Sequence, residues 1–190
     1  LLVGVALWGR QWQGPGLGLL AALFCVVAPG LAEWRVDYVL EIPLCAGCIW
    51  AQWLLGRWLR PNGASWVAAV MAALAIASAL LIKQSALLVL LGPAVWAVVV
   101  GLQERKRRWQ LVASFGFVLA LVAPWLGHNL ITAIGGTNRA TLESAAREGD
   151  PNATSLAGWL WYPQRLPRLI GQIPLIGGLA GAVVAARRPS

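Results

Sequence analysis

Two carboxylates and a lysine have the residue types and spacing that acid–base and phosphate chemistry require. Asp37 and Glu41 share one face if the helix that contains Glu41 already includes Tyr38. Two neighbouring carboxylates raise each other's pKa, which suits a general base. Lys83 is followed by Gln84, and an ammonium beside an amide can hold a phosphate. We therefore predict Asp37 and Glu41 as catalytic residues and Lys83 and Gln84 as phosphate-binding residues.

Glu41 and Lys83 each have a structural alternative. Glu41 lies inside an apolar run, and ionisable groups at membrane depth are costly and usually functional. In the alternative, Glu41 lies at the membrane interface and forms a structural pair with Arg35 or Lys83. Lys83 stands alone between two long apolar segments, where it alternatively extends toward ordinary lipid headgroups.

A third group of polar residues opens the only long segment between apolar runs, residues 128–168. His128 is the sole histidine, so a multi-histidine metal site is excluded, and no carboxylate cluster has metal-ligand spacing. His128 can act as an acid, a base or a hydrogen-bond donor, or it can cap the preceding helix. We predict His128, Asn129 and Arg139 as substrate-binding residues, and an external loop over 128–168 with a short surface helix at 137–148.

The elements that position these residues are expected to be membrane helices. The chain has 190 residues, of which 59% are hydrophobic and 12% charged, and this composition lies outside that of soluble domains. Apolar stretches bounded by charge predict about six complete spans and one partial span at residues 1–9. The complete spans are residues 16–32, 38–56, 66–82, 84–103, 109–127 and 169–186. We expect an all-α polytopic transmembrane bundle forming a single domain over residues 1–190, as a fragment whose first span begins upstream.

The basic residues indicate the orientation of these spans. One set of loops is almost purely basic, with Glu104 as its acidic residue, which is typical of the cytoplasmic side. Its basic residues are Arg10, Arg57, Arg60, Arg105, Lys106, Arg107, Arg108, Arg187 and Arg188. We interpret the run 105–108 as a topology signal that contacts lipid headgroups, and we predict no nucleic-acid partner. Trp58, Trp66 and Trp109 are predicted to anchor span ends at the interface.

Together these motifs resemble a known family. The sequence contains Asp37-x-x-x-Glu41-Ile42-Pro43-Leu44, then Lys83-Gln84, then Pro124-Trp125 with His128-Asn129. This arrangement resembles the bacterial family 39 glycosyltransferases of the GT-C superfamily, relatives of the protein O-mannosyltransferases and the lipid A aminoarabinose transferases. The chain departs from the family pattern at Glu41, where the family usually has Asp.

The resemblance implies an enzyme of the bacterial inner membrane, multi-pass, with its C-terminus in the cytoplasm. It implies transfer of a sugar, with inversion, from a polyprenyl-phosphate carrier to an acceptor on the periplasmic face. Glu41 or Asp37 would line the cavity, and Lys83 would face the lipid phosphate. The lipid-linked sugar donor and membrane lipid are the expected partners; no cofactor is identified, and the acceptor and any divalent metal stay open.

Two other classes of protein are compatible with the same residues. In a polytopic transporter or flippase component, Glu41 and Lys83 would form a gating ion pair or a proton relay. In a catalytically silent membrane scaffold, both residues would be structural.

Overall fold

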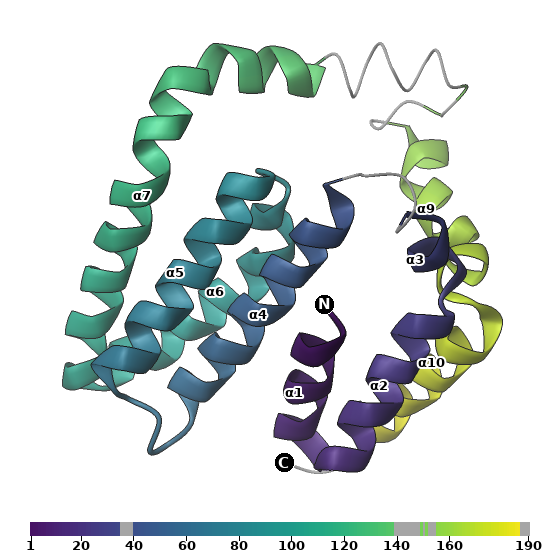
Figure 1. Ribbon diagram of the computed structural model, residues 1–190, viewed down its shortest axis with the longest axis horizontal. Helices are drawn as coiled ribbons and strands as arrows, with labels where there is room; N and C mark the ends of the chain where they lie inside the picture. The colour runs from purple at the N-terminus through teal and green to yellow at the C-terminus, as the bar shows by residue number, and fades with distance from the viewer. Residues whose placement is uncertain (35–39, 139–148, 150, 152–154, 187–190) are drawn as a thin grey trace. The chain divides into compact units, whose positions relative to one another are not determined.

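The computed structural model describes residues 1–34, 40–138, 149, 151 and 155–186, and every regular element within these ranges is an α-helix. The all-α class is therefore confirmed. The helices, labelled in Figure 1, are α1 (Leu2–Gln13), α2 (Pro15–Val27), α3 (Pro29–Trp34), α4 (Glu41–Leu59), α5 (Trp66–Ile82), α6 (Ala86–Gln103), α7 (Arg105–Asn138), α9 (Leu156–Ile170) and α10 (Gln172–Ala186).

Within the described residues, two helices are long and apolar enough to cross a membrane, α6 over Ala86–Gln103 and α7 over Arg105–Thr132. A bundle of six spans is not confirmed: among the described helices, α2 and α5 are shorter, and α4 with its 19 residues is long enough but not apolar enough. α5 begins and ends where the sequence predicts, and its 17 residues are one fewer than the 18 of α6. The two long helices are consistent with membrane association.

The internal contacts of the chain form two compact units. The single domain predicted over residues 1–190 stays a prediction. The first unit comprises Leu1–Leu23 and Asp37–Gly127, and the second comprises Phe24–Val36 and His128–Ser190. The predicted phosphate-binding residues Lys83 and Gln84 therefore belong to the first unit, and His128 and Asn129 belong to the second.

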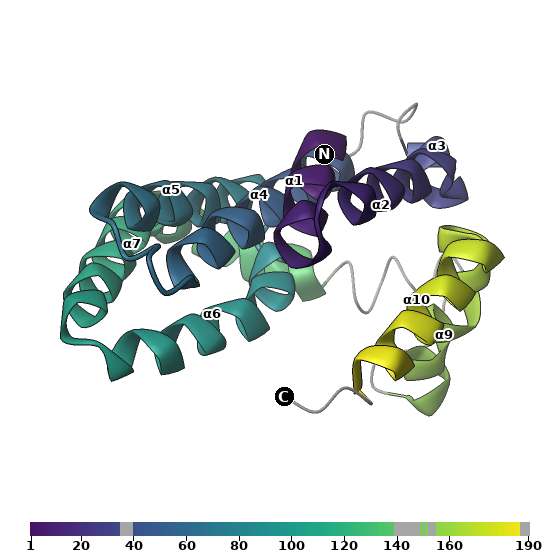
Figure 2. The same cartoon turned by 90° about the horizontal axis from the view of Figure 1, so that it is seen from below.

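The first unit is built around α4, which contacts α1, α5 and α6. α4 and α5 lie side by side, and α6 lies across one face of both (Figure 2). Short connections at 60–65, 83–85 and 104 make α4 to α7 alternate in direction. We call the two ends of this unit the Glu41 end, with residues 40–41 and 82–86, and the Arg107 end, with residues 57–66 and 101–110.

The core of the first unit consists mainly of small residues. Two clusters of buried residues form it: Cys48, Ala51, Ala79, Ala86 and Leu90 in the first, and Leu55, Trp58, Ala69, Ala72 and Ala97 in the second. Large apolar side chains point outward; in α5, Ala72 is 3% exposed whereas Val67 is 74% exposed. Small residues at helix contacts and large ones outside are typical of helices packed within a membrane.

A close approach between α1 and α2 requires glycine. Gly14 has φ of 90°, a left-handed conformation that allows the chain to turn directly from α1 into α2. A Cβ on Gly9 would lie 2.9 Å from Cα of Gly18, so the two helices touch through their backbones. The pair forms a tight helical hairpin in the part of α2 that belongs to the first unit.

In the second unit, α9 contacts α3 and α10. A Cβ on Gly30 of α3 would lie 3.0 Å from the carbonyl oxygen of Leu169 in α9, so these helices are also closely packed. In its described parts, the predicted loop over 128–168 is mainly helical, because α7 continues to Asn138 and Leu156–Ile170 forms α9. Most of the predicted surface helix at 137–148 lies outside the described residues.

Candidate functional site

The structure brings Glu41 and Lys83 together at the Glu41 end. Glu41 is the first residue of α4, and Lys83 follows the last residue of α5. Lys83 has extended φ and ψ of −159° and 132°, so the backbone leaves the helical path of α5 at this residue. Lys83 Nζ donates a hydrogen bond to Glu41 Oε1 and forms an ion pair with it.

This ion pair is open to its surroundings. The side chain of Glu41 is 31% exposed and that of Lys83 is 41% exposed. Glu41 lies outside the two candidate spans, and the hydrogen bond from Lys83 lowers the pKa of its carboxyl below the ordinary value of 4.5. The direction is opposite to the one expected from a pair of carboxylates. Glu41 is therefore an anion, held by a cation that another anion can reach.

The other predicted site residues are distributed differently. Gln84 is exposed in the turn that follows Lys83. Asp37 and Arg139 lie outside the described residues. His128 is exposed on α7, and Asn129 is half-buried beside it, both in the second unit. Among the predicted site residues that are described in the first unit, the structure joins Glu41 and Lys83 by an ion pair.

Within the described part of the chain, no group of three or more His, Cys, Asp or Glu side chains is arranged to hold a metal ion. The candidate site contains the ammonium of Lys83, which pairs with Glu41. An ammonium is a compact point charge that suits a phosphate oxygen.

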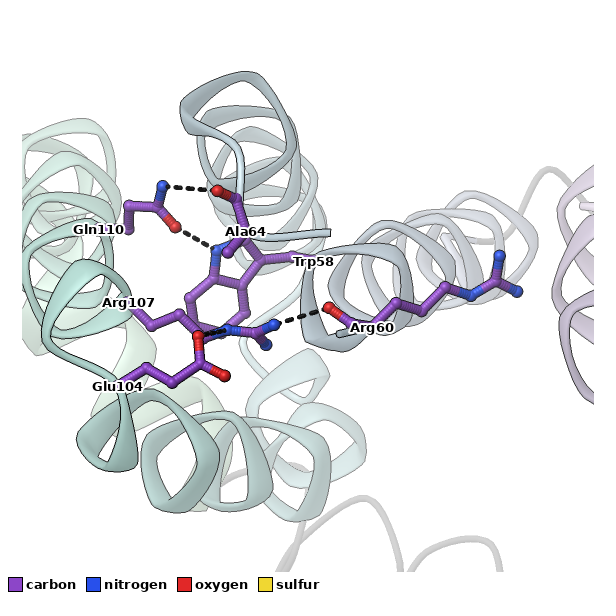
Figure 3. A network of polar contacts seen from close by, with 6 residues as sticks. All are labelled: Trp58, Arg60, Ala64, Glu104, Arg107 and Gln110. Atoms are coloured by element: carbon purple, nitrogen blue, oxygen red, sulfur yellow. Dashed lines mark hydrogen bonds and ion pairs between the residues drawn. The ribbon is translucent and has the colours of Figure 1, made fainter. Parts of the chain in front are cut away.

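Sequence reasoning missed a buried polar network at the Arg107 end. Trp58 Nε1 donates a hydrogen bond of 2.8 Å to Gln110 Oε1, and Gln110 Nε2 donates one of 3.4 Å to the Ala64 carbonyl (Figure 3). Arg107 Nη2 donates to the Arg60 carbonyl at 2.6 Å. Gln110 is 0% exposed, so these bonds replace water for groups that water does not reach.

Arg107 occupies the centre of this network. Its Nε atom donates to Glu104 Oε2 at 2.8 Å, and its guanidinium lies 5.5 Å from the ring centroid of Trp58. It is 1% exposed, and its Nη1 atom is buried with no hydrogen-bond partner among the described residues. The network ties the connection between α4 and α5 to the start of α7.

Two expectations about this end are wrong in detail. Arg107 faces the protein interior, whereas all four basic residues of the run 105–108 were predicted to contact lipid headgroups. Trp58 is 3% exposed and packs in the core, whereas Trp66 and Trp109 are exposed as interface anchors would be. The sequence contains a signal for this network, since Arg107 and Gln110 are three residues apart and therefore lie on one face of a helix.

Comparisons with protein-family models, with curated proteins and with solved structures found no match. The functional argument therefore depends on the site and its surroundings.

Proposed function

We propose that this protein is a membrane glycosyltransferase that transfers a sugar from a polyprenyl-phosphate carrier to an acceptor on the periplasmic face of a bacterial inner membrane. The observation that carries the proposal is the exposed ion pair of Glu41 and Lys83 at one end of the first unit. It combines a carboxylate that can accept a proton with a cation that can bind a phosphate, as this reaction requires.

The environment of the helices supports the membrane part of the proposal. Leu88, on α6, is 78% exposed and Phe115, on α7, is 70% exposed, and both helices are long enough to span. Large apolar faces of this kind are unfavourable in water and favourable in lipid. Arg10, Arg57, Arg60 and the run 105–108 gather toward the Arg107 end. The positive-inside rule then orients the Glu41 end toward the periplasm.

The proposed reaction uses both members of the Glu41–Lys83 pair. The phosphate of the donor binds the ammonium of Lys83, and Glu41 thereby loses its hydrogen-bond partner. Its pKa rises toward the ordinary value, and it accepts the proton of the acceptor hydroxyl. The acceptor oxygen forms a bond to the anomeric carbon as the bond from that carbon to the phosphate oxygen breaks. Polyprenyl phosphate leaves with its negative charge next to Lys83.

The test is transfer of a radiolabelled sugar from polyprenyl phosphate in membrane vesicles that contain the full chain. E41Q and K83Q are each expected to reduce transfer by about 100-fold or more, because each removes a group that acts in the transition state. K106Q is the matched control for K83Q, since it removes an exposed lysine at the Arg107 end, and it is expected to retain activity. Activity that survives both E41Q and K83Q excludes the pair from the site.

A transporter or flippase component is the second candidate, and the ion pair itself favours it, because pairs of this kind can gate a pathway. The charge-reversed variant E41K/K83E separates the two functions. It preserves an ion pair but reverses the positions of base and cation, so a gate is expected to keep working and a transferase to stay inactive. Flux of a polyprenyl-linked sugar across proteoliposomes, restored in the reversed variant, would establish the transporter. A scaffold is expected to show neither transfer nor flux.

A further inference from the structure

A second site is built at the Arg107 end, about 28 Å from Glu41 along the axis of α4. A cavity of about 390 Å³ is lined by Leu7, Arg10, Gln11, Trp53, Arg57 and Arg60, from α1 and the end of α4. Three arginines therefore line one space. Among the described residues, no carboxylate pairs with any of the three arginines.

Local contacts hold two of these arginines in place. Arg57 lies 5.1 Å from the ring centroid of Trp53, where the aromatic face stabilises its charge. The Arg60 carbonyl accepts the hydrogen bond from buried Arg107, and the Arg60 side chain points away from that network (Figure 3). The Nη2 atom of Arg60 is 3.4 Å from the Gln11 carbonyl oxygen of α1. The buried network thus fixes the backbone from which Arg60 reaches the cavity.

An apolar groove adjoins the basic cavity. It has a volume of about 420 Å³ and lies between α1, α4 and α6, with Trp8, Trp12, Leu55, Gly92, Pro93 and Trp96 among its lining residues. Gln11 and Arg60 line both spaces, so the groove opens beside the guanidinium groups. Trp12 is 71% exposed and Trp96 is 62% exposed, so the rim of the groove is aromatic and uncovered.

We propose that Arg10, Arg57 and Arg60, together with the adjoining groove, bind one anionic phospholipid. The phosphate diester binds the arginines, and an acyl chain occupies the groove past Trp96. Charge complementarity points to the occupant: three arginines that pair with no carboxylate among the described residues favour an anion, and the adjoining apolar groove favours an anion that carries a hydrocarbon chain. This site is separate from the Glu41–Lys83 pair and does not depend on glycosyl transfer.

The test is native mass spectrometry of the full chain in detergent, titrated with dioleoyl phosphatidylglycerol. The triple variant R10Q/R57Q/R60Q is expected to weaken phosphatidylglycerol binding by about 30-fold, because it removes all the charges that line the cavity. The matched control is R105Q/K106Q/R108Q, which removes three exposed charges of the same end outside the cavity and is expected to weaken binding by less than about threefold. Equal weakening by both triple variants overturns the proposal, because it indicates diffuse attraction to a basic surface.

Two further probes separate the lipid from other anions. Glycerol phosphate has the anionic group without acyl chains and is expected to bind at least 30-fold more weakly; equal affinity identifies a site for a soluble anion and overturns the proposal. W96A is expected to weaken phosphatidylglycerol binding about fivefold, whereas W109A, which removes an exposed indole elsewhere, leaves it unchanged. If the triple variant fails to fold, the comparison of W96A with W109A tests the proposal in its place.

Discussion

Two polar clusters at opposite ends of the first unit use charge in opposite ways. At the Arg107 end, a cation, an amide and an indole are buried: Arg107 donates to the Arg60 carbonyl, Gln110 donates to the Ala64 carbonyl, and the indole of Trp58 donates to Gln110. At the Glu41 end, one exposed ion pair connects the start of α4 to the residue after α5. Buried polar groups without water must keep their partners, whereas exposed ones can exchange them. The comparison indicates that the buried network stabilises the helices, whereas the Glu41–Lys83 pair can exchange its partners.

The largest effect is expected from removing the centre of the buried network. R107M leaves the Arg60 carbonyl without its donor and leaves the Trp58 ring without its cation, so we expect the free energy of unfolding to fall by about 2 to 3 kcal/mol. Unfolding by SDS in mixed micelles measures it. K106M removes an exposed charge one residue earlier and is expected to change stability by less than about 0.5 kcal/mol. Similar losses for the two variants would remove the distinction between the ends.

A smaller effect is expected from the amide that accepts from the indole. Q110L leaves Trp58 Nε1 buried without an acceptor, which costs about 1 to 2 kcal/mol. W58F removes the donor as well, so the double variant W58F/Q110L is expected to be less destabilised than the sum of the two single variants. Strict additivity in the same unfolding assay would show that the hydrogen bond has no energetic role.

The smallest effect is expected at the Glu41 end. A double-mutant cycle of E41Q and K83Q is expected to give a coupling of about 0.5 kcal/mol, since solvent screens the pair. Because pairing lowers the pKa of Glu41, this coupling is fully present at neutral pH. It disappears as the pH falls below 4.5 through the lowered value. A coupling between Glu41 and Lys83 that exceeds the coupling between Trp58 and Gln110, or that persists at pH 2, would contradict the comparison between the two clusters.

The helices themselves were largely predictable, because hydropathy and charge are local signals. Residues 66–82 were predicted as a span, and α5 has these bounds, since Ser65 caps its start and Lys83 interrupts its apolar pattern. α7 extends beyond the predicted 109–127, because Gly127 and His128 end an apolar stretch without ending a helix. Hydropathy marks where a membrane segment ends, which is a different boundary from the end of a helix.

The contacts between helices were less predictable. Glu41 and Lys83 were both assigned to the outer ends of spans, but their pairing was one of several alternatives, because the two residues are 42 positions apart. Arg107 could not be distinguished from its basic neighbours until the register of α7 against Trp58 was known. The sequence predicts which residues reach each end, and packing determines which of them face inward.

The alanine core described above has a consequence for how this sequence tolerates change. A Cβ on Gly47 would already lie 3.1 Å from Cβ of Ala79, so the contact between α4 and α5 has no room for growth. On the outward faces, side chains such as that of Val67 are exposed, so neighbouring helices restrict their shape less. We expect exchanges among large apolar residues on the outward faces to be neutral. On the inward faces, we expect the addition of a single methyl group to be damaging.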